Sequence, residues 1–190
     1  TNSEIQKSNK NLKGEHVGAF LVFDTQENSE VLVKVSSSFI NHVQASINLN
    51  REIPENISFD ELVEEGKLVW NNELSKIKVA SQESEKTNED LIKFYSSLYR
   101  TILFPRQFHE YDLDNNQIHY SPYDGNIYDG PLYTDNGFWD TFRAVFPFYS
   151  LVYPEKLGEI IQGIMVNPYI ESGWLPEWSS PGHRDCMIAV

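Results

Sequence analysis

The first fifty residues begin with runs of apolar residues that are typical of β-strands and end with apolar residues at the spacing typical of a helix. Val17 to Phe23 and Glu30 to Ser36 are rich in β-branched and aromatic residues and are separated by a Gln, Glu, Asn, Ser turn, which predicts a β-hairpin. Because two strands alone are marginally stable in water, this hairpin needs a larger sheet or the following helices as a packing partner. The serines at 36–38 are expected to cap a helix that runs to about Asn50.

Helical spacing predicts four further helices, which cover about 58–76, 87–104, 138–151 and 154–167. The first opens with a capping box at Ser58. The second should stop before Pro105, and the third should be kinked or divided at Pro147. Pro154 suits the first position of the fourth helix, which is expected to end before Pro168.

Between and after these helices lie segments without a regular period. Residues 78–80 are expected to form a short strand, and the polar residues 82–88 indicate a linker. Residues 106–136 are rich in tyrosine and show no period; a loop of that length is usually functional or a sign against the assignment. Residues 171–184 are irregular and punctuated by Gly and Pro. The apolar end, 186–190, is unlike a natural terminus, so the chain is expected to be a fragment of a larger protein.

Composition excludes several classes of protein. The 190 residues are 40% hydrophobic and 13% aromatic, enough to bury a core. With 28 acidic against 15 basic residues and no basic cluster, nucleic acid is not an expected partner. No apolar run is long enough to span a membrane. The N-terminal residues lack the charged segment followed by an apolar segment that marks a signal peptide, so the chain is cytosolic or its leader lies outside the sequence. The single Cys186 permits no internal disulfide, which suits the cytosol, a bacterial periplasm or a cell surface.

The stretch from Asn136 to Arg143 carries the first candidate chemistry. It reads Asn, Gly, Phe, Trp, Asp, Thr, Phe, Arg and places Trp139 beside Asp140 at the mouth of a predicted helix. The C–H face of a pyranose packs on an aromatic plane, while its hydroxyls need acceptors such as a carboxylate. The alternative is that Trp139 is a core aromatic and Asp140 a first-turn acid favoured by the helix dipole.

A second stretch, Gly173 to Asp185, repeats this chemistry. Its aromatic and polar side chains are Trp174, Trp178, Glu177, His183, Arg184 and Asp185. If the loops between helices gather at one end of a helical array, the two stretches form one concave polar and aromatic floor. Alternatively, the Trp and Pro residues simply plug the end of a bundle.

The patterns that could indicate a metal site or a nucleophile are weaker than the pattern of a sugar site. Asp112, Asp114 and Asn116 have the alternate spacing of a calcium loop, but the required Gly and Glu are absent from positions six and twelve, so an exposed turn is expected. His109, His119 and His183 include no pair four residues apart on a helix, which disfavours a metal. Cys186 has an apolar flank and is expected to be buried rather than reactive.

Four segments, taken in order, carry a family resemblance: Phe94 to Pro105, Phe138 to Arg143, Gly173 to Trp178, and Cys186 to Ile188. They resemble the calcium-dependent exo-α-mannosidases of glycoside hydrolase family 92. The earlier segment Val35 to Ile53 is similar to the end of that family's N-terminal domain and its exit, through Ser38, Phe39, Ile40, Ala45, Asn48, Leu49 and Glu52. The likeness covers nearly the whole chain; one departure is Ala189, where Gly is expected.

The resemblance implies a mixed α and β, mainly α, fold. The C-terminal strands of a β-sandwich would be followed by the first helix pairs of an (α/α)6 toroid, incomplete in this chain. Residues 1–50 would end the N-terminal sandwich domain, 51–88 would be a linker helix and connection, and 89–190 would be the first part of the catalytic domain.

The resemblance also implies a function: removal of terminal α-linked mannose, expected to be α-1,2-linked, from glycans by an inverting mechanism. Family members use a calcium ion, a Glu general acid and an Asp general base, and inversion requires the two carboxylates to stand roughly 6.5 to 9.5 Å apart. No motif in this chain matches the acid, the base or the calcium ligands, which are expected beyond Val190 in the remainder of the catalytic domain. The residues expected to bind substrate are Trp139, Asp140, Glu177, Trp178, Asp185 and Cys186. The expected location is periplasmic, cell-surface or secreted.

Two other interpretations remain open at this point. The aromatic loops could hold carbohydrate without chemistry, as in a binding or scaffold protein, and the lack of a matched acid and base favours this reading. Alternatively, catalysis lies within the chain, with Glu177 as acid and Asp140 as base.

Overall fold

The computed structural model describes residues 14–27, 29–80, 85–176 and 178–180. The chain divides into two compact units, Thr1–Val33 and Lys34–Val190. The expected turn is present, because the carbonyl of Gln26 accepts a hydrogen bond from the amide of Ser29 at 3.1 Å. However, the described residues on either side of this turn form no strand, so the predicted hairpin is wrong there. Its apolar side chains are exposed and lack the burial that stabilises a sheet.

Helix α1 (His42–Glu52) begins later than expected. Its N-cap is Asn41, whose side chain accepts hydrogen bonds from the second and third helical amides at 2.9 and 3.0 Å. The predicted caps at 36–38 are therefore wrong. Ser38 is used elsewhere: its hydroxyl donates to the Glu110 carboxylate at 3.0 Å. Glu110 also accepts from the Asn48 amide at 2.7 Å, so it ties both the approach to α1 and the helix itself to strand β2 (Glu110–Tyr111).

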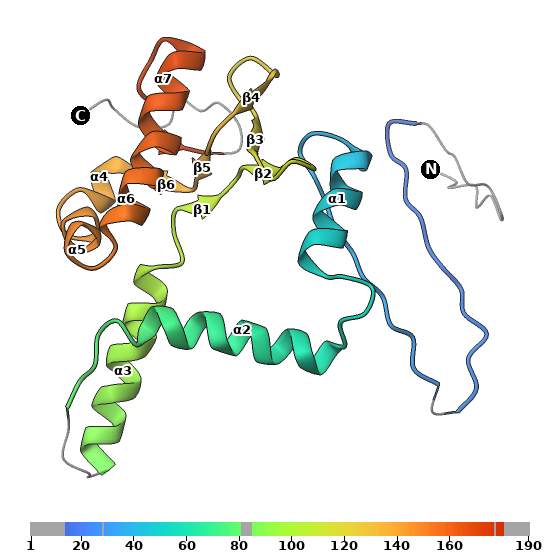
Figure 1. Ribbon diagram of the computed structural model, residues 1–190, viewed down its shortest axis with the longest axis horizontal. Coiled ribbons are helices and arrows are strands. Elements are labelled where there is room, and N and C mark those ends of the chain that lie inside the picture. The colour runs from blue at the N-terminus through green and yellow to red at the C-terminus, as the bar shows by residue number, and fades with distance from the viewer. Residues whose placement is uncertain (1–13, 28, 81–84, 177, 181–190) are drawn as a thin grey trace. The chain divides into compact units, whose positions relative to one another are not determined.

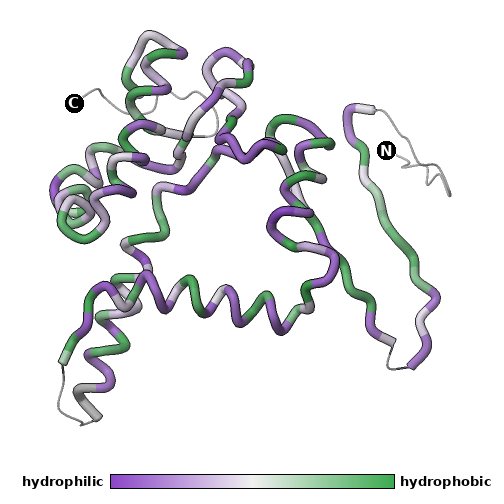
Figure 2. Tube along the Cα trace, viewed as in Figure 1, coloured by the Kyte–Doolittle hydropathy of each residue, from purple (hydrophilic) through white to green (hydrophobic). Residues whose placement is uncertain are grey.

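Helices α2 (Phe59–Leu74) and α3 (Glu85–Thr101) follow. The capping box at Ser58 is confirmed in both directions, and the apolar and polar positions alternate along α2 in Figure 2. Trp70 of α2 packs on Tyr99 of α3 with ring centroids 4.5 Å apart. The predicted strand at 78–80 is absent, and α3 ends at Thr101, a few residues before Pro105.

The region expected to be irregular contains short antiparallel strands (Figure 1). They are β1 (Arg106–Gln107), β2 (Glu110–Tyr111), β3 (Gln117–Tyr120), β4 (Ile127–Asp129), β5 (Tyr133–Thr134) and β6 (Asn136–Gly137), with β7 (Trp178–Ser179) farther along the chain. Strands β2, β3 and β4 form one sheet, while β1 pairs with β5 and β6 with β7. Strands of two to four residues are too short to show a period of two in the sequence.

The C-terminal helices differ from the two expected long ones. They are α4 (Phe138–Thr141), α5 (Val145–Val152), α6 (Pro154–Ile161), the π-helical turn η1 (Gln162–Val166) and α7 (Asn167–Ser172). The predicted division of the first long helix is confirmed, because Pro147 lies in the first turn of α5, where a missing amide hydrogen costs least. The start of α6 at Pro154 is confirmed too.

The predicted stop before Pro168 is wrong, because α6, η1 and α7 form one column in Figure 1. The wide turn η1 accommodates the proline: the amide of Asn167 donates to the carbonyl of Gln162, five residues earlier. Gly163, within this turn, lies against β5. A Cβ atom at Gly163 would stand 2.8 Å from the ring of Tyr133 and 3.1 Å from the carbonyl oxygen of Pro131.

The main core lies where β5 meets the C-terminal helices. Its buried members are Tyr133, Tyr149, Tyr153, Ile160 and Ile164. The hydroxyl of Tyr149 lies 2.7 and 2.9 Å from the carbonyls of Thr101 and Phe104, which fixes the chain just after α3. Burial raises the pKa of this phenol to about 12, so it stays a hydrogen-bond donor at any physiological pH.

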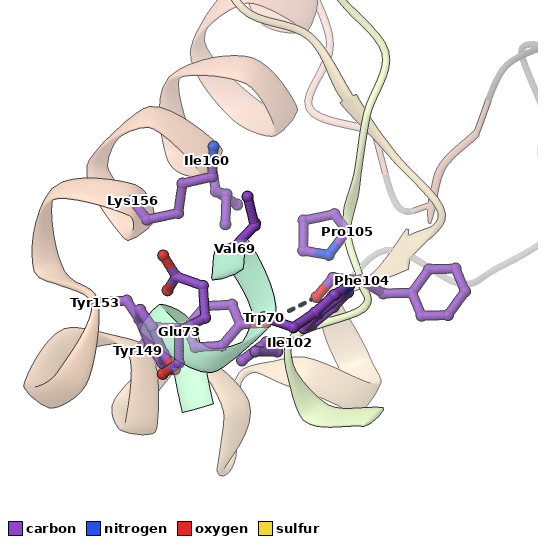
Figure 3. A pocket seen from close by; sticks show the side chains of 10 residues that line it. All are labelled: Val69, Trp70, Glu73, Ile102, Phe104, Pro105, Tyr149, Tyr153, Lys156 and Ile160. Carbon is purple, nitrogen blue, oxygen red and sulfur yellow. Dashed lines mark hydrogen bonds between the residues drawn. The ribbon is translucent and has the colours of Figure 1, made fainter. Parts of the chain in front are cut away.

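A cavity of about 270 Å³ lies beside this core, between α2 and helices α5 and α6 (Figure 3). Aromatic rings dominate its lining, among them Trp70, Phe104, Tyr149 and Tyr153. The hydroxyl of Tyr153 donates to the carbonyl of Glu73 at 3.1 Å, so the cavity is a seam along which α2 docks. None of its lining residues belongs to the predicted sugar site.

The close approach at Gly163 gives a stability test. We expect Gly163→Ala to lower the free energy of unfolding by about 1–3 kcal/mol, because the added methyl group meets a fixed ring and a backbone carbonyl. Gly158→Ala in α6 is the matched control, since a Cβ there has nothing within 4 Å. Alanine should stabilise that position by about 0.5–1 kcal/mol. Thermal unfolding of the purified protein compares the two variants, and equal shifts would disprove the close approach.

Candidate functional site

The two stretches that carry the predicted sugar chemistry meet in the structure. Strand β6 pairs with β7 so that Asn136 lies opposite Ser179 and Gly137 lies opposite Trp178. The two stretches are about forty residues apart in sequence, and α4 begins directly after β6. The expectation that they gather at one place is confirmed for the described residues.

Gly137 is the point where the site's side chains converge. A Cβ atom at this position would stand 2.5 Å from ring carbon Cζ3 of Trp178 and 2.7 Å from carboxylate oxygen Oδ2 of Asp140. The indole and the carboxylate therefore pack directly on the backbone of the glycine. We call Gly137, Asp140 and Trp178 the Gly137 cluster. Only glycine permits this arrangement, because any other side chain would occupy the space of both partners.

Trp139 and Asp140 both face solvent. Half of the Trp139 side chain is exposed, so the alternative that it is a core aromatic is wrong. Asp140 lies in the first turn of α4, as the helix alternative required, but α4 has only four residues and Gly137 supplies no capping side chain. Among the described residues the Asp140 carboxylate makes no hydrogen bond or ion pair. It is thus an acceptor available to a ligand.

A buried polar layer supports the Gly137 cluster. Ser179 is 2% exposed, and its hydroxyl donates to the carbonyl of Tyr133 at 2.6 Å, which joins β7 to β5. The phenol of Tyr133 accepts a hydrogen bond from the ammonium group of Lys156, and burial raises its pKa far above the usual range. Asn136 is also 2% exposed, yet neither side-chain polar atom has a hydrogen-bond partner among the residues that the structure describes.

Next to this layer, a polar network braces the β-sheet against α6. The Glu159 carboxylate accepts from the Lys156 ammonium at 2.9 Å and from the Gln117 amide at 3.0 Å. Burial opposes ionisation of Glu159, but these bonds outweigh it and hold the pKa below the usual value. The amide of Gln117 also lies 3.0 Å from Nε2 of His109. Burial lowers the pKa of His109, so its imidazole is neutral and accepts this bond.

His109 and His119 use both ring nitrogens in hydrogen bonds within the protein. His119 is fully buried, with Nδ1 2.9 Å from the carbonyl of Gly130 and Nε2 2.8 Å from the carboxylate of Glu171. His109 uses both ring nitrogens as well, since its Nδ1 lies 3.2 Å from the carbonyl of Leu132. Within the part of the chain that the structure describes, no three His, Cys, Asp or Glu residues form a metal cluster.

The segment with the spacing of a calcium loop forms a turn, as expected. The Asp112 carboxylate accepts from the backbone and side-chain amides of Asn116 at 2.8 and 3.0 Å, and these bonds lower its pKa. Asn115 adopts a positive φ of 70° in this turn, and its side chain accepts a hydrogen bond from Arg51 of α1. The acidic residues of this segment therefore shape a loop that docks α1.

Several predicted site residues lie outside the described residues: Glu177, His183, Arg184, Asp185 and Cys186. Trp174 is described and is 80% exposed, with its backbone tied to the Ser172 hydroxyl. Of the predicted substrate-binding residues, the structure thus places Trp139, Asp140 and Trp178 near one another.

As for membranes, no described helix combines the length and apolarity needed to cross a bilayer.

Sequence reasoning missed the importance of Gly137 and Ser179. Gly137 stood inside the predicted stretch, but a glycine gives no sign of which rings will approach it. The dipeptide Asn136 and Gly137 has the composition of a turn, which hid a strand of two residues. Ser179 had no signal at all, because its role depends on a carbonyl 46 residues away.

Chemically, this segment offers a half-exposed indole at Trp139 and an exposed carboxylate on the next residue. Such a surface suits an uncharged polyol with one apolar face, because the ring takes the C–H face and the carboxylate accepts from hydroxyls. The described residues contain no second carboxylate close to Asp140 that the structure connects to it.

Comparisons with known proteins identify the family of the chain. The family model for the glycosyl hydrolase family 92 catalytic domain matches residues 44–190. A solved GH92 inverting mannosidase from Bacteroides thetaiotaomicron VPI-5482 is 50% identical with a TM-score of 0.74, over 80% of this chain and 20% of that chain. A GH92 α-mannosidase from Bacteroides thetaiotaomicron, solved with mannoimidazole, is 29% identical with a TM-score of 0.64, over 79% of this chain and 19% of that one.

The chain thus spans about a fifth of the length of these solved relatives. No curated protein matches its sequence. The family model nevertheless covers most of the chain, including both stretches that meet at the Gly137 cluster. The chain belongs to glycosyl hydrolase family 92.

Proposed function

We propose that the complete natural polypeptide containing this chain is an exo-acting α-mannosidase, and that this chain supplies part of its mannose-binding floor. The observation that carries the proposal is the convergence of Asp140 and Trp178 on Gly137, next to the exposed ring of Trp139. The family membership and the mannosidase relatives support it. The substrate would be the terminal α-linked mannose of a glycan, with α-1,2-linked mannose as the expected linkage.

In this proposal the described residues bind and orient the sugar. Trp139 packs on the C–H face of the pyranose, and Asp140 accepts hydrogen bonds from its hydroxyls. Because Asp140 has no hydrogen-bond partner among the described residues, little of the interaction energy goes into breaking bonds within that part of the chain. A fixed platform of this kind lowers the entropy cost of bringing the glycosidic bond to the catalytic groups.

The general acid and general base of the inverting reaction would lie outside the described residues. Glu177, the acid in the alternative that keeps catalysis within the chain, is itself not described. The calcium ion that the resemblance implies finds no fitting ligand cluster among the described residues, so its ligands would also lie elsewhere. The remainder of an (α/α)6 toroid and an N-terminal β-sandwich would supply these groups.

Two features are consistent with such a larger enzyme. A solved relative that shares the fold of this chain is about four times as long. Helix α2 buries none of its residues and exposes Phe59, Leu68 and Val69, which is the surface expected of a helix that packs on further polypeptide. A secreted, periplasmic or cell-surface location would give the enzyme access to glycans.

A carbohydrate-binding protein without catalysis is the second candidate. The absence of a connected carboxylate pair among the described residues favours it. The two candidates differ in one measurement: the release of mannose from an aryl α-mannoside or a mannose-terminated glycan by the complete natural polypeptide. Binding of mannose without release would select the second candidate.

Asp140 provides the first functional test. We expect Asp140→Ala to lower kcat/KM for an aryl α-mannoside at least tenfold, because it removes charge-assisted hydrogen bonds worth about 1.5–3 kcal/mol each. The melting temperature should change little, since a first-turn acid contributes only about 0.3–1 kcal/mol. Glu155→Ala, which removes an exposed first-turn acid of α6, is the matched control for the helix effect. A variant that melts early but keeps its turnover would make Asp140 a helix residue only.

Gly137 provides a second test. We expect Gly137→Ala to reduce kcat/KM by at least tenfold, because the methyl group displaces both the Trp178 ring and the Asp140 carboxylate. Gly66→Ala in α2 is the control, since a Cβ there meets nothing within 4 Å. Kinetics with an aryl α-mannoside and thermal unfolding are measured together. Wild-type kinetics in Gly137→Ala would contradict the role of the Gly137 cluster.

A further inference from the structure

Arg143 lies against the exposed indole of the site, where three contacts hold it. It lies in the link 142–144 between α4 and α5. Its guanidinium carbon stands 4.3 Å from the centroid of the Trp139 ring and 4.4 Å from that of Phe142. Its Nη1 atom donates to the carbonyl oxygen of Trp139 at 2.6 Å. Arg143 is therefore fixed to both the backbone and the ring of Trp139.

The backbone contact follows from the shortness of α4. A helix of four residues leaves most of its carbonyls without an amide donor, and the carbonyl of Trp139 is one of them. The side chain of Arg143 replaces that missing donor. Because a guanidinium is planar, the group that satisfies the carbonyl can also lie flat over the indole, which an ammonium group cannot do.

This stacking has a consequence for the site. One face of the Trp139 ring is covered by the guanidinium, while half of the side chain stays exposed. A sugar can then pack only on the part of the ring that Arg143 leaves open. The guanidinium also makes no ion pair with Asp140 among the described residues, so the carboxylate remains free to accept hydroxyl groups.

We propose that Arg143 is a positioning residue for mannose recognition, which covers one face of Trp139 and so fixes the face and tilt that the indole presents to the sugar. This inference rests on the proposed function, because it assigns Trp139 to the sugar platform. Arg143 acts through Trp139 and does not touch the sugar. The rival explanation is structural: Arg143 only completes the hydrogen bonding of α4.

A double-mutant cycle in the complete natural polypeptide separates these explanations. With 4-nitrophenyl α-mannoside as the probe, we expect Arg143→Ala to lower kcat/KM about three- to tenfold, mainly through a higher KM, because the platform binds ground state and transition state alike. Arg143→Lys should recover only part of the loss, since lysine keeps the charge but not the planar stacking. In a Trp139→Ala background, Arg143→Ala should cause no further loss.

Arg100→Ala is the matched control. Arg100 is exposed and its Nη1 atom also approaches the carbonyl four residues earlier, at 3.5 Å, but no aromatic ring lies under its guanidinium among the described residues. This variant should keep wild-type kinetics.

Two results would overturn the inference while leaving the mannosidase proposal intact: an active wild type whose Arg143→Ala variant has unchanged KM, or a loss of the same size with and without Trp139. A wild type that releases no nitrophenol would instead refute the mannosidase proposal, and this inference with it.

Discussion

The burial of Tyr133 in β5 is the constraint on which the rest of the site depends. Its ring packs among Tyr149, Ile160 and Ile164, and its close contact with η1 is possible only because residue 163 is glycine. The carbonyl of Tyr133 accepts the hydroxyl of Ser179, so the same residue that anchors the core also anchors β7. The core thus fixes β5, β5 fixes β7, and β7 places its tryptophan over Gly137.

In this series of contacts, buried residues support residues that are exposed to solvent. The strand residues beneath the Gly137 cluster are almost fully buried, whereas Trp139 and Asp140 project from a helix of four residues into solvent. A binding group held by a buried scaffold needs little reorganisation when a ligand arrives. The guanidinium of Arg143 restrains the exposed ring of Trp139 in turn, because it contacts both that ring and the backbone carbonyl of the same residue.

Part of this organisation could be predicted because it depends on neighbours in sequence. The capping box at Ser58, the start of α6 at Pro154 and the division of a helix near Pro147 are local effects of single residues on backbone amides. The predictions that proved wrong depended on distant partners. The described part of the hairpin lacks a sheet to pair with, Ser38 bonds to Glu110 instead of capping α1, and a π-helical turn carries the chain past Pro168.

The sequence by itself determined the family, the candidate sugar chemistry of Trp139 and Asp140, and the turn at Asp112, because residue type and spacing carry those properties. Only the tertiary structure decided that β6 and β7 pair, and that a glycine lies beneath an indole and a carboxylate. The physical reason is the sequence separation over which each interaction acts. Capping, turns and helical spacing depend on residues a few positions apart, so they can be recognised in the sequence. Packing joins residues some forty positions apart and produces no periodic pattern in the residues between them.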